Sequence, residues 1–287
     1  MKKSKFISYK STVWSIRTEK FTRTALCINY YEAPNATGLI VWLPGMSDKP
    51  IADRNNPFLS YFIPRGLQKN FSVAVVCFPG TFDRRYIEER TLSTMRQNVS
   101  DAVVALSKRI KYYSNLKKVL IGRSAGGTLV ASFLDGGFEI GISIAGRLKL
   151  TELYTNIRKK FRQRRFYPMN AVKSFLRIRY PEKINNKNLY CLNEQYVKEL
   201  RIEEQLIEQS FDRANKDVTL LAIQAKDDDV VPFQLDRWEQ LAKKNGIPIT
   251  LFPLSVPCGH AFATQPAIRL TTQIILSFIT KKGTRYV

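Results

Sequence analysis

Apolar residues fall into short, separated runs from about residue 37 onward, with longer amphipathic stretches between them. This alternation is typical of βα units that build a mainly parallel sheet. Six of these runs have the length and apolar content of buried strands, and two earlier runs joined by a polar turn fit an edge hairpin. The expected strands are residues 13–18, 25–31, 39–43, 73–78, 118–121, 140–144, 218–223 and 249–252.

Helix-length patterns separate these strands, and one connection is far longer than the others. Pro64 lies inside the first pattern and predicts a kink or a break, because proline lacks an N–H group. Residues 147–216 exceed any ordinary connection, so we expect a helical cap insertion there. The core is then residues 1–146 and 217–287, an α/β fold with about eight mostly parallel strands. The expected helices are residues 57–69, 90–112, 125–134, 232–244 and 267–281.

Composition narrows the protein class. The chain has 287 residues, 44% of them hydrophobic, which is enough for one large domain with an insertion. No apolar stretch reaches the roughly 18 residues that a membrane span needs, and no signal peptide is expected. The four cysteines lack a metal-ligand spacing and the density of a disulfide scaffold, so we expect a cytoplasmic location. They are Cys27, Cys77, Cys191 and Cys258.

Candidate chemistry begins at residues 118–127, where an expected strand runs into Gly122-Arg123-Ser124-Ala125-Gly126 and then a helix. The G-x-S-x-G pattern in this context predicts a sharp turn that exposes the Ser124 hydroxyl. Gly and Ser are common in any tight turn, so the flanking strand and helix carry the prediction.

A serine hydroxyl needs a neighbouring base, and the base needs a third group that orients it. His260 is the one histidine of the chain and follows the last expected strand. A carboxylate run, Asp227-Asp228-Asp229, follows the strand before it. One or two of these carboxylates are expected to be solvated turn residues or a helix cap, and the run alone does not say which one orients His260.

These motifs resemble the alpha/beta-hydrolase superfamily, over roughly residues 37–147 and from residue 218 to the end. In many members the acid strand ends G-x-x-D-x-V-V-P. That pattern implies Asp228 as the acid, with Ala225 where glycine is usual, and leaves Asp227 and Asp229 without a catalytic role. The resemblance thus implies a Ser124–His260–Asp228 triad.

The resemblance also implies an oxyanion hole. One donor is the backbone N–H after the serine, here that of Ala125. The other comes from residues 43–47, where Pro44-Gly45 replaces the usual His-Gly. Because proline has no N–H, Met46 is the expected second donor. Arg123 is less usual inside the motif, and an ion-pair partner and a surface residue are both open interpretations.

The formal net charge of +22 predicts a positive surface field but names no partner, since a lysine-rich proteome would give the same value. Residues 157–167 of the expected cap are a dense basic run with interleaved aromatic residues. A solvated helix face, an anionic substrate or lipid surface, and nucleic acid are three competing interpretations. No specific nucleic acid is predicted, and the oligomeric state is not determined by the sequence.

We therefore expect a serine esterase or thioesterase that forms an acyl-enzyme, with a cap that favours an anionic or lipid-like acyl substrate. No metal or organic cofactor is implied. A peptidase, an acyltransferase and a carbon–carbon hydrolase stay open, because each can use the same three residues. The alternative from another class is a noncatalytic protein of the same fold that binds an anionic partner through its basic cap.

Overall fold

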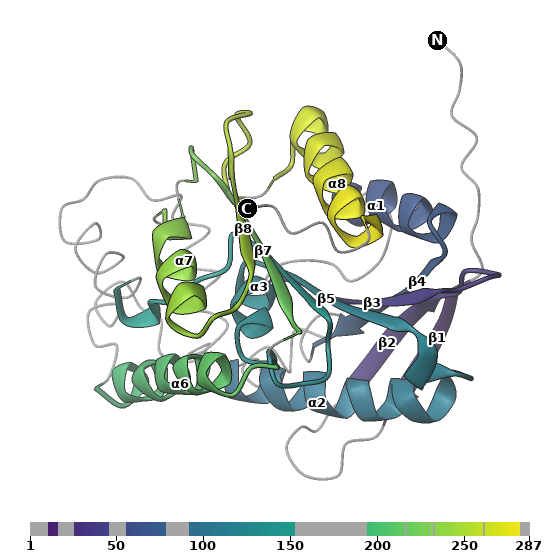
Figure 1. Cartoon of the computed structure of the whole chain (residues 1–287), viewed down its shortest axis with the longest axis horizontal. Coiled ribbons are helices and arrows are strands. Elements are labelled where there is room, and N and C mark those ends of the chain that lie inside the picture. The colour runs from purple at the N-terminus through teal and green to yellow at the C-terminus, as the bar shows by residue number, and fades with distance from the viewer. Residues whose placement is uncertain are drawn as a thin grey trace, which may run out of the picture.

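One eight-stranded sheet organises the chain (Figure 1). The computed structural model describes residues 11–16, 26–45, 56–78, 92–152, 194–215, 217–228, 230–231, 233–260 and 262–281. The strand order is β1-β2-β4-β3-β5-β6-β7-β8. Strands β1 and β2 are antiparallel to their neighbours, and the pairs from β4 to β8 are parallel. The expected fold class, with about eight mostly parallel strands, is confirmed.

Every expected strand is present, with bounds shifted by a few residues. The continuous apolar runs explain the agreement, because β3 and β4 are buried at every position and lie in the middle of the sheet. The strands are β1 Ser11–Ile16, β2 Leu26–Tyr31, β3 Gly38–Leu43, β4 Phe71–Cys77, β5 Lys117–Arg123, β6 Ile140–Ile144, β7 Thr219–Ala225 and β8 Ile249–Leu254.

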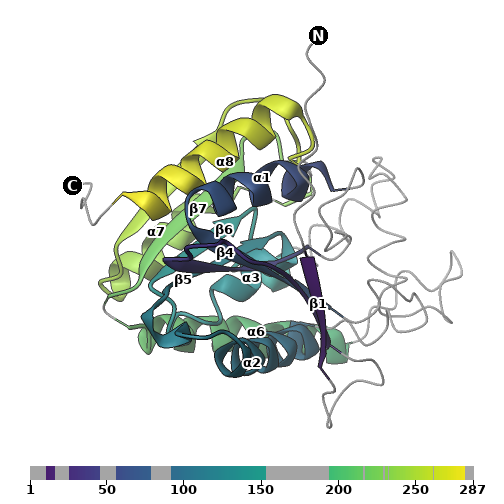
Figure 2. The same cartoon turned by 90° about the vertical axis from the view of Figure 1, so that its right-hand side faces the viewer.

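Helices cover both faces of the sheet and complete three apolar clusters, one on the first face and two on the other. Helices α1 and α8 pack on one face, and α2, α3, α6 and α7 pack on the other. Figure 2 shows the sheet between α1 and α8 on one side and α2 and α6 on the other. The helices are α1 Pro57–Gln68, α2 Leu92–Arg109, α3 Ala125–Val130, α6 Glu194–Asp212, α7 Leu235–Lys244 and α8 Gln265–Thr280, with a short 3-10 turn at Tyr113–Asn115.

Helix ends differ from the sequence prediction where tertiary contacts intervene. Helix α1 runs through Pro64, so a break there was wrong. Helix α3 ends at Val130 rather than at residue 134, and the N–H of Leu134 instead donates to the Ser210 hydroxyl of α6. Helix α7 begins at Leu235, because the N–H of Gln234 donates to a buried side chain of β7.

The expected cap, residues 147–216, is described only at its two ends, and residues 153–193 lie outside the described residues. Its last part includes α6, which packs into the helical layer beneath the sheet rather than standing apart from it. Ile207 and Phe211 of α6 join the core around Trp238 of α7, and Arg96 of α2 forms a 2.6 Å ion pair with Glu203. The division into core and cap stays a prediction.

The parallel strands β5 to β8 are neighbours in the sheet, so their carboxyl ends meet at one edge. Ser124 follows β5, Asp228 follows β7, and His260 follows β8. The topology therefore brings all three sequence-predicted triad residues to the same edge.

Among the residues that the structure describes, no helix combines the length and apolar content that a membrane span needs.

Candidate active site

Three side chains at the sheet edge form one hydrogen-bonded chain. The Nε2 atom of His260 lies 2.8 Å from the Oγ atom of Ser124, and its Nδ1 atom lies 3.0 Å from Oδ2 of Asp228. The Asp228 side chain is 1% exposed, whereas that of His260 is 19% exposed. With a proton on Nδ1, Nδ1–H donates to the carboxylate and Nε2 is free to accept the serine proton.

The serine is held in a backbone conformation that few non-glycine residues adopt. Ser124 has φ 53° and ψ −118°, between the end of β5 and the start of α3. Such a conformation costs about 1–3 kcal/mol and persists only where its surroundings enforce it. Part of that enforcement is the Ser124 N–H, which donates to the Ile144 carbonyl at 2.8 Å. The turn directs the hydroxyl out of the sheet.

Glycines make this turn sterically feasible. A Cβ atom on Gly122 would collide with the carbonyl of Gly126, and one on Gly126 would collide with the carbonyl of Leu43. A Cβ atom on Gly146 would likewise collide with the backbone of Gly127, so α3 lies directly on the ends of β3 and β6. The glycines are therefore required by backbone contact around the serine, beyond the turn itself.

The acid loop is closed by hydrogen bonds to buried side chains. Oδ1 of Asp228 accepts from the N–H groups of Val230 and Val231 at 3.0 and 2.7 Å, which leaves Oδ2 for His260. The buried side chain of Gln224 donates to the Val231 carbonyl at 3.2 Å and accepts from the Gln234 N–H at 2.8 Å. These hydrogen bonds hold the Asp228 carboxylate in place independently of its contact with the His260 imidazole.

The histidine loop, residues 255–264, is held from a neighbouring strand end. Oδ2 of Asp227 accepts from the N–H groups of Cys258 and Gly259 at 2.9 and 3.1 Å. These two hydrogen bonds, first that from Gly259, lower the pKa of Asp227 below its usual value. On the other side of His260, Phe262 is fully buried at a φ of 50°. The imidazole therefore projects from a loop anchored on both sides.

Sequence analysis missed the contact that Asp227 makes with the histidine loop. The motif comparison left it without a role, yet it contacts the backbone next to His260. Its signal in the sequence was only adjacency to Asp228, because the partner loop is more than 30 residues away. Asp229, the third carboxylate of the run, lies outside the described residues.

Of the two expected oxyanion donors, Ala125 lies within the described residues and Met46 does not. Ala125 is the first residue of α3, where a backbone N–H has no partner within the helix. Met46 lies outside the described residues. The loop that leads to it passes close to the serine turn, because a Cβ on Gly126 would meet the carbonyl oxygens of both Leu43 and Pro44. The loop after β3 therefore lies against Gly126, the residue that follows Ala125.

Other candidate features lie outside the triad. Arg123 is half-buried beside the serine, and the basic run at 157–167 lies outside the described residues. No group of three or more His, Cys, Asp or Glu side chains suited to a metal ion occurs in the part of the chain that the structure describes.

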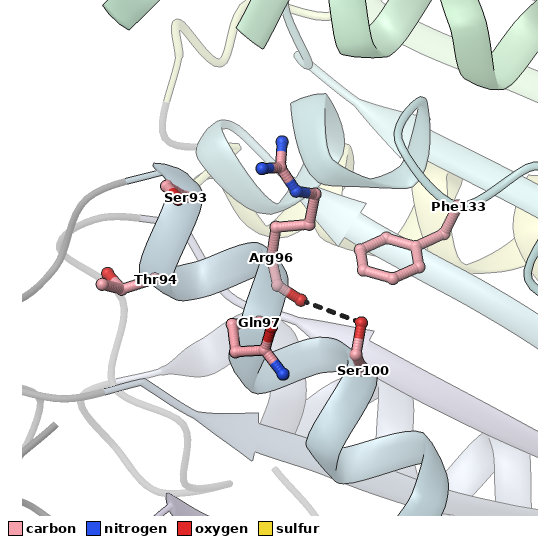
Figure 3. Close-up of a pocket in the computed structure, with 6 residues that line it drawn as sticks. All are labelled: Ser93, Thr94, Arg96, Gln97, Ser100 and Phe133. Carbon is pink, nitrogen blue, oxygen red and sulfur yellow. Dashed lines mark hydrogen bonds between the residues drawn. The ribbon is translucent and has the colours of Figure 1, made fainter. Parts of the chain in front are cut away.

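A pocket of about 190 Å³ lies at the start of α2 and is separate from the triad residues (Figure 3). Five of its six lining residues are polar, but the Arg96 guanidinium is already paired with Glu203, and the Ser100 hydroxyl donates to the Arg96 carbonyl. The lining residues are Ser93, Thr94, Arg96, Gln97, Ser100 and Phe133.

Comparisons with known proteins give a consistent fold. No protein-family model and no curated protein matches the sequence. Among solved structures, a dienelactone hydrolase from Anabaena variabilis is similar with a TM-score of 0.59 and 13% identity, over 94% of this chain and 97% of that chain. A carboxyl esterase from Bacillus coagulans matches with a TM-score of 0.62 and 11% identity, over 95% and 98% of the two chains.

A third similar structure is the acylaminoacyl peptidase of Pyrococcus horikoshii, with a TM-score of 0.67 and 14% identity. The match covers 99% of this chain and 43% of that larger chain. At these identities the likeness concerns the fold. The sheet order, the serine turn and these structures together show that the chain has the fold of the alpha/beta hydrolases.

Proposed function

We propose that this protein is a serine hydrolase that cleaves a carboxylic ester or thioester through an acyl-enzyme intermediate. The observation that supports this proposal is the chain of hydrogen bonds from Ser124 through His260 to the buried Asp228. A solvated loop histidine would not be expected to contact both a buried carboxylate at Nδ1 and, at Nε2, a serine with a strained backbone conformation.

In the first half of the proposed reaction, Oγ of Ser124 attacks the acyl carbon while Nε2 of His260 takes its proton. Asp228 stabilises the imidazolium that forms and keeps Nδ1 as the donor. The tetrahedral intermediate then collapses, and the imidazolium returns the proton to the departing alcohol or thiol. Water repeats the sequence on the acyl-enzyme, releasing the acid and restoring Ser124.

The negative charge of the tetrahedral intermediate requires donors beside the serine. We assign the Ala125 N–H as one donor and the Met46 N–H as the second. The first assignment is supported by the position of Ala125 at the start of α3, which leaves its N–H without a helical partner. The second is an expectation from the motif, with the approach of the β3 loop to Gly126 in its favour.

For the substrate, we propose an anionic or lipid-like acyl group selected by the basic run of the cap. The run includes Arg162, Arg164 and Arg165 within residues 157–167. Replacing these three with glutamine should lower kcat/KM for anionic esters while leaving neutral esters of equal length unaffected. An unchanged ratio between the two classes would remove the substrate half of the proposal and leave the hydrolase half intact.

The reaction class is tested by labelling the purified full chain with a fluorophosphonate probe, which modifies activated serines. The native chain should be labelled, Ser124→Ala should not be, and His260→Ala should label far more slowly. Ser132→Ala is the matched control, since Ser132 lies in the turn after α3 and should label as the native chain does. An unlabelled native chain would favour a noncatalytic protein that binds an anionic partner.

A further inference from the structure

We propose that Asp227 is a positioning residue that holds the backbone of the histidine loop and thereby sets the place of His260 relative to Ser124. This inference deepens the proposed function and rests on it. Two adjacent carboxylates would then divide one task, because Asp227 fixes the loop and Asp228 fixes the ring that the loop carries.

The contact that supports this role spans two strand ends. Asp227 lies in the turn after β7, and its Oδ2 accepts both the Cys258 N–H at 2.9 Å and the Gly259 N–H at 3.1 Å. Gly259 directly precedes His260 and has a φ of 57°. The carboxylate therefore accepts hydrogen bonds from the backbone N–H groups of the two residues that precede His260.

These hydrogen bonds favour the charged form of the acceptor. They hold the pKa of Asp227 below its usual value, so Asp227 is a carboxylate throughout the neutral range. Hydrogen bonds to an ionised acceptor are stronger than those between neutral groups. An exposed aspartate with no role beyond its contact with solvent would not be expected to accept hydrogen bonds from two N–H groups of a loop more than 30 residues away.

Asp227 and Asp228 are consecutive residues, so a single turn after β7 carries the contacts to both the backbone and the ring of the histidine loop. Asp228 directs Oδ2 to the His260 ring and Oδ1 to its own loop, whereas the backbone of the histidine loop donates to Asp227. One residue earlier, the Lys226 N–H donates to the Leu254 carbonyl at 2.9 Å. Residues 226–228 thus hold the end of β8, the histidine loop and the imidazole in succession.

The test compares Asp227→Ala with Asp227→Asn in the full chain, using an ester that the native protein cleaves. Alanine removes the acceptor, and we expect kcat to fall about ten- to hundredfold, the range for a displaced catalytic group, with KM within twofold. Asparagine keeps one oxygen that can accept both N–H groups, so its kcat should stay within about threefold of native. Amide exchange at Cys258 and Gly259 should accelerate only in the alanine variant.

Asp217→Ala is the matched control, because it removes an exposed aspartate ahead of the same strand, at the opposite edge of the sheet. Native kcat in Asp227→Ala would overturn the inference. An asparagine variant as impaired as the alanine variant would also overturn it, since charge rather than the two hydrogen bonds would then matter. Loss of the folded state in Asp227→Ala would assign it a domain-wide role instead. Absence of activity in the native chain would contradict the proposed function itself.

Discussion

The serine turn and the histidine loop are held in place by different means. Around Ser124, backbone packs on backbone, and the glycines at 122 and 126 admit no side chain at all. Around His260, the loop is anchored by a carboxylate of another loop and by the buried ring of Phe262. The glycine spacing that permits the first region lies within one pentapeptide, whereas the Asp227 carboxylate that anchors the second lies 31 residues before Cys258.

This difference decides how each region responds to change. A strained turn inside close packing has one accessible conformation, so a substitution there disturbs the fold as well as the serine. A loop held by a few hydrogen bonds can shift by a fraction of an ångström without unfolding the domain. We therefore expect substitutions near Ser124 to affect stability and activity together, and substitutions near His260 to affect activity more than stability.

Asp228→Asn should give the largest effect, because it acts on the histidine ring itself. The amide can still accept from the Val230 and Val231 N–H groups but presents an NH₂ group to Nδ1, which favours the wrong imidazole tautomer. We expect kcat to fall about 10⁴-fold with the fold intact. Steady-state kinetics and the urea midpoint measure the two quantities separately.

Asp227→Asn is the neighbouring control for this experiment, since the same chemical change one residue earlier should cost little. Equal losses in the two variants would mean that the carboxylates act only as a local negative charge. A much smaller loss in Asp228→Asn would contradict the orienting role of Asp228.

Gly122→Ala should give the next largest effect, on stability as well as activity. Its Cβ would meet the carbonyl of Gly126 and the backbone of Gly127, which cannot move aside cheaply. We expect a loss of about 3 kcal/mol or more in the free energy of unfolding, at the upper end for overpacked sites. Urea denaturation and fluorophosphonate labelling should decline together.

Gly66→Ala in α1 is the matched control. Its Cβ would meet only Val73 and Ile40 side chains, at 3.5 and 3.8 Å, which are ordinary contacts. Because alanine favours a helix over glycine by about 0.5–1 kcal/mol, this variant should be at least as stable as the native chain. A tolerated Gly122→Ala would show that the serine turn is less tightly packed than the glycine contacts indicate.

Gln224→Leu tests the closure of the acid loop, with an intermediate effect. The substitution leaves the buried Val231 carbonyl and Gln234 N–H without the side chain that pairs them. An unsatisfied buried polar group costs about 1–3 kcal/mol, so the urea midpoint should fall clearly. Gln97→Leu, which removes an exposed hydrogen bond to Asp101 on α2, should change stability by no more than about 0.5 kcal/mol.

The same contrast explains what the sequence could predict. Apolar runs located all eight strands, and the runs are continuous where both faces of a strand are buried, as in β3 and β4. The serine turn was equally visible, because glycine spacing and the nucleophile lie within one pentapeptide. The Ser210 contact that replaces the end of α3 and the Asp227 contact with the histidine loop each join segments more than 30 residues apart, and no local pattern predicts them. The Gln224 contacts span only 7 and 10 residues, but they depend on the path of the loop after β7.

Cys258 offers the smallest effect and a direct measure of charge in the histidine loop. Burial first, and then the negative charges of Asp227 and Asp228, raise the pKa of its thiol to about 11. Because the thiolate is the reactive form, alkylation by iodoacetamide should be slow at pH 8 and rise roughly tenfold per pH unit towards that pKa. Asp227→Asn removes one of the two charges and should speed alkylation at pH 8 by a few-fold, read at the Cys258 peptide by mass spectrometry. Rapid alkylation of the native chain at pH 8 would mean that the loop opens readily, and the histidine would then lack the fixed support that distinguishes it from a solvated loop residue.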